Sequence, residues 1–424
     1  MAKRPTHVTP RTDHGLPRSI HVLPRNSHVL PRKDYTAIDM PQLLQTMKNH
    51  KKQSVRLSRL GQPGKKMLAL LLPGHNEELI IQDTIKSAIV SGMDVADIYV
   101  VDDSSTDKTR RKAVELLGTK HVMTVKRSGK AKAVYKAIKR FDIEKRYRWV
   151  HVADADSVFG KDYFRIYRKA LKGKKYVVAV GFVQSLRGNW ISSYRSFSYT
   201  YSQHIIRRWQ SWLGMISVFP GPITCFRTDI IKDLDFLSGS IAEDFDLTLQ
   251  VHRKKLGKIR FIPRAVNFTQ DPQTLRDFIK QTARWQRGFF QGVVKYKIGR
   301  RLHVIDLSIG YSMLQMIIYL LEMFVFVPFI IADTGRWVVI PIILLADFFV
   351  VSLLSFFSSF AAKRLSILGS LPYFYFLRWV EIIVFLVAFI EVVVLRRFRT
   401  EVKGWATEGR RYALNVKALE DTAR

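Results

Sequence analysis

The sequence is nearly devoid of cysteine, since Cys225 is the only one among 424 residues. A single cysteine excludes an intrachain disulfide, and it fits a domain that faces the reducing cytosol. The start of the chain lacks the apolar core of a secretory signal peptide. Acidic residues are also scarce, with 35 Asp and Glu against 69 Lys and Arg.

The excess of cations gives a formal net charge of +34, which in a soluble protein would suggest nucleic-acid binding. Here the Lys and Arg residues are spread along the chain, and no DNA- or RNA-binding motif accompanies them. Long apolar runs follow residue 305, so this charge favours anionic membrane lipids and a nucleotide diphosphate as partners. We therefore expect no nucleic-acid partner.

The beginning of the chain is polar and basic and contains a seven-residue repeat. Its units start at His7, His14, His21 and His28, and each contains the dipeptide Pro-Arg. Proline breaks helices, so the repeat is not a coiled coil. We expect a flexible, partly polyproline-like tether that touches acidic headgroups, or else a disordered tail without a specific role. A basic helical linker is expected to follow it.

Strand-like and helix-like segments alternate from Met67 onward. The strand-like segments and their loops read MLALLLPGHNEE, DIYVVDDSSTD, HVMTVKRSGKAKA and RYRWVHVADADS. Such alternation predicts an α/β domain with a mostly parallel sheet and helices on both faces. Ligands of these sheets bind at the carboxyl ends of the strands, which is where the acidic loops fall.

Three apolar runs begin at Tyr311, Trp337 and Tyr373, each near or above the roughly 20 residues that cross a bilayer. The segment before them mixes cations with bulky apolar side chains, which suits an amphipathic interface helix. The expected parts of the chain are a tail and linker (1–66), a cytosolic catalytic domain (67–286), an interface segment (287–310), a transmembrane region (311–397) and a basic tail (398–424).

Asp154 and Asp156 stand at the end of the fourth predicted strand with one residue between them. Two carboxylates at this spacing can hold a divalent cation, Mg or Mn, because hard cations prefer oxygen ligands. The cation would neutralise charge on a diphosphate leaving group. A pair this short is expected by chance about once in such a chain, so a solvated turn is the alternative interpretation.

Two further polar groups follow predicted strands. Asp102 and Asp103 can accept hydrogen bonds from a base or ribose, although Asp, Ser and Thr here could equally cap a helix. Lys130 and Lys132 can reach nucleotide phosphates as point charges, although a solvated basic face would have the same composition.

The segment AEDFD supplies Glu243, Asp244 and Asp246. When a hydroxyl displaces a diphosphate, a general base must take the hydroxyl proton, and one of these carboxylates can do so. The alternative is a helix start, because acids are favoured at the positive end of the helix dipole.

The segment QTARW places Gln281, Arg284 and Trp285 on one face of a helix, at positions i, i+3 and i+4. Arg284 can hold a diphosphate through a fork of charge-assisted hydrogen bonds, and Trp285 can stack on a sugar ring. A chance match is expected roughly once per hundred chains. The alternative is a core tryptophan beneath a snorkelling arginine.

The segments PGHNEE, VVDDSSTD, SGKAKA, DAD, AEDFD and QTARW, in this order, resemble glycosyltransferase family 2. The resemblance runs from Met67 to the end of the third apolar run. It is strongest to the membrane synthases of poly-N-acetylglucosamine, hyaluronan, chitin and cellulose. It implies an A-type glycosyltransferase fold followed by an interface helix and C-terminal transmembrane helices. The usual Thr-Glu-Asp of the family reads Ala-Glu-Asp here, with Ala242 in place of Thr.

The resemblance also implies roles for individual residues. Asp244 would be the catalytic base, Asp156 would bind the metal, Asp103 would contact the uracil base and Asp154 would contact the nucleotide. The remaining substrate-binding residues would be those that reach the phosphates, the diphosphate and the acceptor: Lys130, Gln281, Arg284 and Trp285.

Residues and resemblance together predict an inverting glycosyltransferase of the cell membrane with a cytosolic catalytic domain. It would transfer a sugar, with N-acetylglucosamine as the best guess, from a UDP-sugar to a growing β-linked polysaccharide. Its cofactor would be a divalent cation, and its partners would include anionic lipids and an oligomer or accessory membrane subunit. The alternatives are single transfer to a lipid-linked acceptor, and a catalytically inactive membrane scaffold.

Charged residues interrupt the apolar runs. Arg378 and Glu381 are spaced to pair with each other, and Glu322 or Asp347 is expected to face the protein interior. Three crossings would put the cations after Val394 outside, against their tendency to remain in the cytosol. We therefore expect the third run to be re-entrant or broken, and the C-terminus to be cytosolic.

Overall fold

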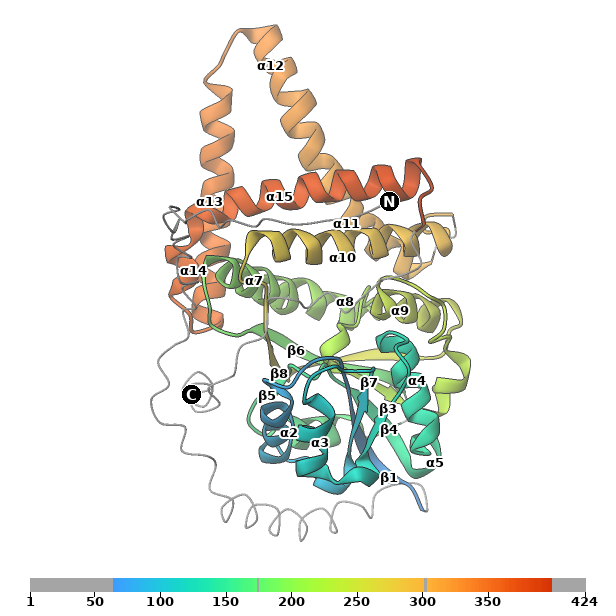
Figure 1. Cartoon of the computed structure of the whole chain (residues 1–424). Helices are drawn as coiled ribbons and strands as arrows, with labels where there is room; N and C mark the ends of the chain where they lie inside the picture. Colours follow the sequence, from blue (N-terminus) through green and yellow to red (C-terminus); the bar gives the residue numbers. More distant parts are fainter. Residues whose placement is uncertain (1–63, 174, 301–302, 399–424) are drawn as a thin grey trace, which may run out of the picture. The chain divides into compact units, whose positions relative to one another are not determined.

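Eight strands form one mixed sheet in the computed structural model, which describes residues 64–173, 175–300 and 303–398. The strand order is β3-β2-β1-β4-β7-β6-β8-β5 (Figure 1). In chain order the strands are β1 Lys66–Gly74, β2 Ile98–Asp102, β3 Val122–Thr124, β4 Tyr147–Val152, β5 Val158–Phe159, β6 Tyr176–Ser185, β7 Thr224–Arg227 and β8 Lys258–Thr269. The expected repeat tail, basic linker and C-terminal tail lie outside the described residues.

The sheet is parallel except at two strands. β1 pairs in parallel with β2 and β4, β2 with β3, and β6 with β8. β7 is antiparallel to both β4 and β6, and β5 is antiparallel to β8. The expected mostly parallel sheet is therefore a mixed one, in which β5 and β7 run against the other strands.

Helices cover both faces of the parallel half. Alternate residues such as Leu71 and Val101 belong to a core shared with α4 (Lys130–Arg140) and α9 (Glu243–Arg253). Right-handed crossovers place α2 (Ile81–Val90) and α3 (Thr109–Leu117) on the opposite face. The continuous apolar runs of β1 and β2 fit this burial on both sides.

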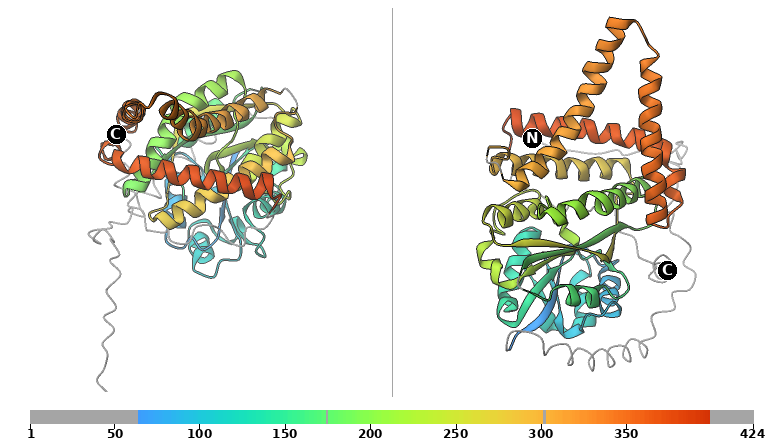
Figure 2. Two further views of the ribbon diagram at one scale, coloured as in Figure 1. Left: turned by 90° about the horizontal axis from the view of Figure 1, so that it is seen from above. Right: turned by 180° about the vertical axis from the view of Figure 1, so that it is seen from behind.

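A helical layer separates the sheet from the apolar C-terminal region. α7 (Trp190–Tyr201) packs on β6, and α10 (Leu275–Lys295) packs on α9 and α15 (Leu371–Phe389). α15 runs alongside α10 in both side views (Figures 1 and 2). The shorter helices are α5 Ile143–Arg146, α6 Tyr163–Ala170, α8 Arg207–Leu213 and α14 Ser366–Gly369, with a π-helical segment at Ser202–Ile206.

The segment 287–310, expected to be one interface helix, belongs to two helices instead. Its first part completes α10, which ends at Lys295. A separate helix, α11 (Val304–Leu321), then begins and continues through a π-helical turn (Glu322–Phe326) into α12 (Val327–Thr334). The segment is therefore not a single helix, and its place at a membrane interface stays a prediction.

α11, α12 and α13 (Val339–Ala361) form a hairpin that extends away from the helical layer (Figure 2). Among the described residues, only α13 is a helix both long and apolar enough to span a membrane, so the three expected crossings are not confirmed. The third apolar run is one continuous helix, α15 with a π-helical extension at Ile390–Val394, and not two broken pieces.

The charges in the apolar runs pair differently from the expectation. Arg378 donates to Asp347 at 2.7 Å, and Glu381 accepts from Arg195 at 3.2 Å, so the local pair of Arg378 with Glu381 is wrong. The prediction that Asp347 faces protein is confirmed, because its carboxylate contacts α15. The side chain of Glu322 lies outside the described part of the chain.

Candidate active site

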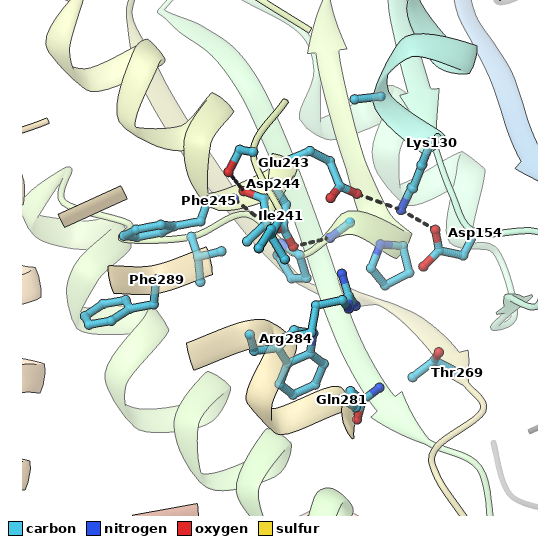
Figure 3. A pocket seen from close by; sticks show the side chains of 18 of the residues that line it. Lys130, Asp154, Ile241, Glu243, Asp244, Phe245, Thr269, Gln281, Arg284 and Phe289 are labelled. Atoms are coloured by element: carbon cyan, nitrogen blue, oxygen red, sulfur yellow. Dashed lines mark hydrogen bonds and ion pairs between the residues drawn. The ribbon is translucent and has the colours of Figure 1, made fainter. Parts of the chain in front are cut away.

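A cavity of about 1200 Å³ lies where strand ends meet the helical layer. The loops after β1, β2, β4 and β8, the start of α4, the start of α9 and one face of α10 line it. Figure 3 shows Lys130 and Asp154 on one side of it and Arg284 and Gln281 on the other. All eight predicted site residues border this one cavity: Asp103, Lys130, Asp154, Asp156, Asp244, Gln281, Arg284 and Trp285.

Asp103 follows β2 and is fully buried. Its carboxylate accepts hydrogen bonds from the backbone N–H groups of Ser128 at 2.8 Å and Gly129 at 2.9 Å. Gly129 has a φ of 83°, a left-handed conformation that glycine adopts without strain, and it precedes the first residue of α4. Asp103 therefore fixes the loop that aims Lys130 into the cavity. The contact of Asp103 with uracil stays a prediction.

The side chain of Lys130 lies between a carboxylate that follows β4 and one at the start of α9. Its ammonium donates to Asp154 and lies 3.8 Å from Glu243 (Figure 3). Burial opposes the charged form, but Asp154 and Glu243 outweigh it and raise the pKa of Lys130. A Cβ at Gly221 would stand 2.8 Å from the ammonium nitrogen, so a larger residue there would make the end of the Lys130 side chain shift.

The structure separates two carboxylates of the AEDFD segment, which forms the first turn of α9. Asp244 borders the cavity and accepts from the backbone N–H of Gly221 at 3.3 Å. Burial, with a contribution from the charge of Glu243, raises the pKa of Asp244 to about 6, although Lys130 and Arg284 act against the shift. A carboxylate with this pKa is suited to proton transfer near neutral pH.

Asp246 is 1% exposed and is absent from the cavity wall. Its oxygens accept hydrogen bonds at 2.7 to 3.0 Å from four side chains: Ser238, Gln250, Lys295 and Tyr296. A carboxylate satisfied in this way ties α9 to α10 and has no access to a substrate. Of the three acids of this segment, Asp246 is therefore structural.

The QTARW segment lies on α10 with one face toward the cavity, as its spacing predicted. The Nε–H of Arg284 is buried and has no hydrogen-bond partner among the described residues. An unsatisfied cationic donor at a cavity wall suits an anionic ligand. α10 can approach α9 this closely because residue 288 is glycine: a Cβ there would come within 2.4 Å of the Ala242 Cβ.

Asp154 and Asp156 both border the cavity beyond β4. No group of three or more His, Cys, Asp or Glu side chains within the described ranges is arranged to hold a metal ion. Mg²⁺ is commonly held by one or two carboxylates together with substrate phosphates and water. These two carboxylates therefore fit a hard cation that protein and nucleotide would bind jointly.

Several cavity residues were missed by the sequence reasoning. Arg207 borders the cavity, and burial lowers its pKa to about 10 despite the nearby charge of Asp244. Gln270 and Asp271 also border it, directly after the last residue of β8. The strand-end rule could have found the latter two, whereas no local pattern marks Arg207.

Comparison with known proteins places these motifs in a family. The family model described as "Glycosyl transferase family group 2" matches residues 149–393, more than half of the chain. A poly-beta-1,6-N-acetyl-D-glucosamine synthase from Staphylococcus epidermidis is 26% identical over 227 residues, which cover 52% of this chain and 54% of the relative. The probable glycosyltransferase YdaM from Bacillus subtilis is 27% identical over 258 residues, 57% of this chain and 60% of the relative.

The chain spans between half and two thirds of the length of these relatives. Among solved structures, the mannosyltransferase PcManGT from Pyrobaculum calidifontis, in complex with GDP-Man and Mn²⁺, aligns with a TM-score of 0.46 and 15% identity. That alignment covers 78% of this chain and 95% of the mannosyltransferase.

Proposed function

The chain belongs to glycosyl transferase family group 2 and is a glycosyltransferase, and we propose that it is an inverting enzyme of the A-type fold. Its donor is a UDP-sugar, and its product is a β-linked polysaccharide of N-acetylglucosamine type. The curated relatives named as poly-beta-1,6-N-acetyl-D-glucosamine synthases support this choice of sugar. Transfer of a single sugar to a lipid-linked acceptor is the alternative for the same site.

The observation that carries the proposal is that the predicted site residues meet at one cavity. Six sequence segments that are far apart in the chain bring their polar residues to one cavity, with Asp244 at its wall. Chance matches to short motifs would scatter over the surface, so their meeting argues for one catalytic site. The pKa of Asp244, about 6, supports its role as the base.

The proposed reaction follows from this geometry. Asp244 takes the proton of the acceptor hydroxyl, whose oxygen bonds to the anomeric carbon as the bond to the UDP oxygen breaks. Arg284 stabilises the negative charge of the departing diphosphate through its free donor. A divalent cation held by Asp154, Asp156 and the phosphates would supply further charge neutralisation when bound.

The membrane arrangement is part of the proposal. Both ends of the α11–α13 hairpin are tied to the catalytic side. Near its start Asp306 pairs with Arg253 at 2.5 Å, and after its end Arg364 donates to Leu186 at 3.3 Å and Ser192 at 3.0 Å. A hairpin with both ends on one side crosses the bilayer an even number of times. α15 then lies on α10 along the cytosolic surface.

We propose on this basis that the C-terminus is cytosolic, and we expect a tag after Arg424 to be inaccessible to an impermeant label in intact cells. Labelling of that tag without permeabilisation would refute the two-crossing arrangement. A tag in the turn between α12 and α13, at Gly335, provides the positive control for an exposed site.

A donor panel tests the enzymatic proposal. Purified protein is incubated with labelled UDP-sugars and a divalent cation, and the sugars added per acceptor are counted. We expect transfer from UDP-N-acetylglucosamine to a polymer, and we expect Asp244→Asn to lose transfer while still binding UDP. Near-normal turnover by that variant would remove Asp244 as the base, and one sugar per acceptor would favour the lipid-linked alternative.

A further inference from the structure

Arg195 of α7 is a buried cation that lies outside the cavity but touches its wall from behind. The residue is 3% exposed, and it is absent from the cavity lining. We propose that Arg195 is a positioning residue that fixes the cavity-facing side chains of α10, and that Glu381 of α15 holds it in place. The proposal rests on the proposed function, because transfer is its main readout.

Hydrogen bonds connect Arg195 to two helices at once. One terminal nitrogen, Nη2, donates to Thr282 Oγ1 at 2.8 Å and to Gln281 Oε1 at 3.3 Å, both on α10. The other, Nη1, donates to Glu381 Oε1 at 3.2 Å on α15. Tyr194 donates to the second oxygen of Glu381 at 2.7 Å, which fixes that carboxylate in turn. The planar guanidinium thus joins α7, α10 and α15.

Two aromatic rings of α10 enclose the same guanidinium. Its central carbon lies 4.3 Å from the ring centroid of Phe278 and 4.7 Å from that of Trp285. Stacking on Trp285 constrains the plane of an indole that borders the cavity. Arg195 therefore contacts the α10 face over two turns, on both sides of Gln281.

The chemistry of the guanidinium decides how Gln281 is presented. Arginine has five N–H donors and no acceptor, so only the carbonyl oxygen of the Gln281 amide can bond to it. The amide NH₂ group is then left to the cavity as a donor, and it cannot flip without placing two donors against each other. Arg195 thereby sets both the polarity of Gln281 and the plane of Trp285, the two residues expected beside the diphosphate and acceptor.

The test is a double-mutant cycle on kcat. Arg195→Met should lower kcat by about 100-fold, since small misplacements of positioning groups cost that much. The Kd of UDP, measured by calorimetry with Mn²⁺, should change less than about threefold, because Asp103, Lys130 and Asp154 stand on the other wall. In a Gln281→Ala background the effect of Arg195→Met should shrink to less than about tenfold, because Arg195 acts through Gln281.

Arg195→Lys keeps the charge but loses the forked hydrogen bonds of the guanidinium, so its kcat should lie between those of Arg195→Met and the wild type. The lysine variant also replaces the methionine variant in the test if the latter does not fold. Arg253→Met is the matched control, because Arg253 is a partly buried arginine, its side chain 13% exposed, that pairs with Asp306 on α11 and does not line the cavity. It should lower the melting temperature and leave kcat within about threefold.

Equal kcat losses for Arg195→Met with and without Gln281 would show that Arg195 does not act through Gln281 and would overturn the proposal. Wild-type kcat in Arg195→Met would overturn it as well. If the wild-type protein transfers no sugar from any donor, the proposed function fails first. The effect of Arg195→Lys and Arg195→Met on the fluorescence of Trp285, against a Trp285→Phe blank, would still test the positioning.

Discussion

The two walls of the cavity are built by different means. Loops at strand ends form the strand-end wall, which contains Asp103, Lys130 and Asp154, and backbone N–H groups and ion pairs within the sheet domain fix it. Helices form the helical wall of Asp244, Gln281, Arg284 and Trp285, and its orientation depends on helix packing and on Arg195. The first wall is a product of local loop geometry, and the second is a product of contacts with the C-terminal helices.

This difference suggests separate roles for the two walls of the site. On the proposed function, the strand-end wall would hold the nucleotide without help from α15, because the contacts that fix this wall come from the sheet domain. On the same proposal the helical wall carries the base and the groups beside the acceptor, and it is tied to α15 through the pair of Arg195 with Glu381. Changes to the first wall should therefore act on donor binding, and changes to the second should act on turnover.

Metal removal should have the largest effect, because it disables the strand-end wall as a whole. We expect an excess of chelator to abolish transfer and added Mn²⁺ or Mg²⁺ to restore it, since Asp154 and Asp156 fit a hard cation only together with the phosphates. Asp156→Ala should require more cation for half-maximal rate. Full transfer in excess chelator would exclude the site.

Asp103→Ala should weaken UDP binding by about 100-fold, because two charge-assisted hydrogen bonds to the loop before α4 disappear. The kcat at saturating donor should fall much less. Calorimetry with UDP and steady-state kinetics separate the two effects. Asp246→Asn is the contrasting variant, since it should reduce thermal stability and leave the affinity for UDP unchanged. Unchanged UDP affinity in Asp103→Ala would contradict the division between the walls.

Gly288→Ala changes the helical wall, so it should lower kcat and leave UDP binding nearly unchanged, the reverse of Asp103→Ala. The added methyl would meet Ala242 at 2.4 Å, so α10 must move away from α9. We expect kcat to fall by about tenfold and UDP affinity to stay within threefold, with destabilisation of about 1–3 kcal/mol. Thermal melts and kinetics measure both. Gly369→Ala is the control, because nothing lies within 4 Å of the Cβ it would add, its φ is not in the left-handed region, and it stands on α14 outside the cavity lining.

The pH dependence should give the smallest effect: at pH 6 we expect kcat to be about twofold lower than its value at higher pH. Only the ionised form of Asp244 can accept a proton, so with a pKa of about 6 the kcat should fall about tenfold per pH unit below that value. The contribution to stability has the opposite sign. A carboxyl whose folded pKa is raised binds protons more tightly when folded, so its contribution falls as pH rises from about 4 to 6. A kcat that is flat from pH 7 to 5 would contradict the assignment.

The strand-end wall was predictable because its residues follow apolar strands. β1 and β2 are nearly continuous apolar runs and β4 has the sequence YRWVHV; Asp103 directly follows β2, and Asp154 stands two residues after the end of β4. The face of α10 was also predictable, since helical spacing alone puts Gln281 and Trp285 together. Local sequence also indicated the helix start at AEDFD, but it could not tell Asp244 from Asp246. That distinction depends on Lys295 and Tyr296, about fifty residues away.

The C-terminal region was less predictable for the same reason. Hydropathy marked three runs, but it cannot show that α15 packs lengthwise on α10. Arg378 and Glu381 have the spacing of a local pair, yet partners on other helices hold both of them. No local pattern marks Arg195 either, because its partners on α10 and α15 are 86 and 186 residues away.

The long separation between Arg195 and Glu381 has a consequence for the order of synthesis. At about 5–20 residues per second, a ribosome delivers Glu381 roughly 10 to 40 s after Arg195. Within that interval β7, β8 and α10 are made in turn, so the sheet domain and α10 are complete once Lys295 has been added, before the residues of the hairpin. On the proposed function, a chain synthesised past Lys295 would therefore bind nucleotide before it could transfer sugar, and transfer would begin only once α15 had packed on α10.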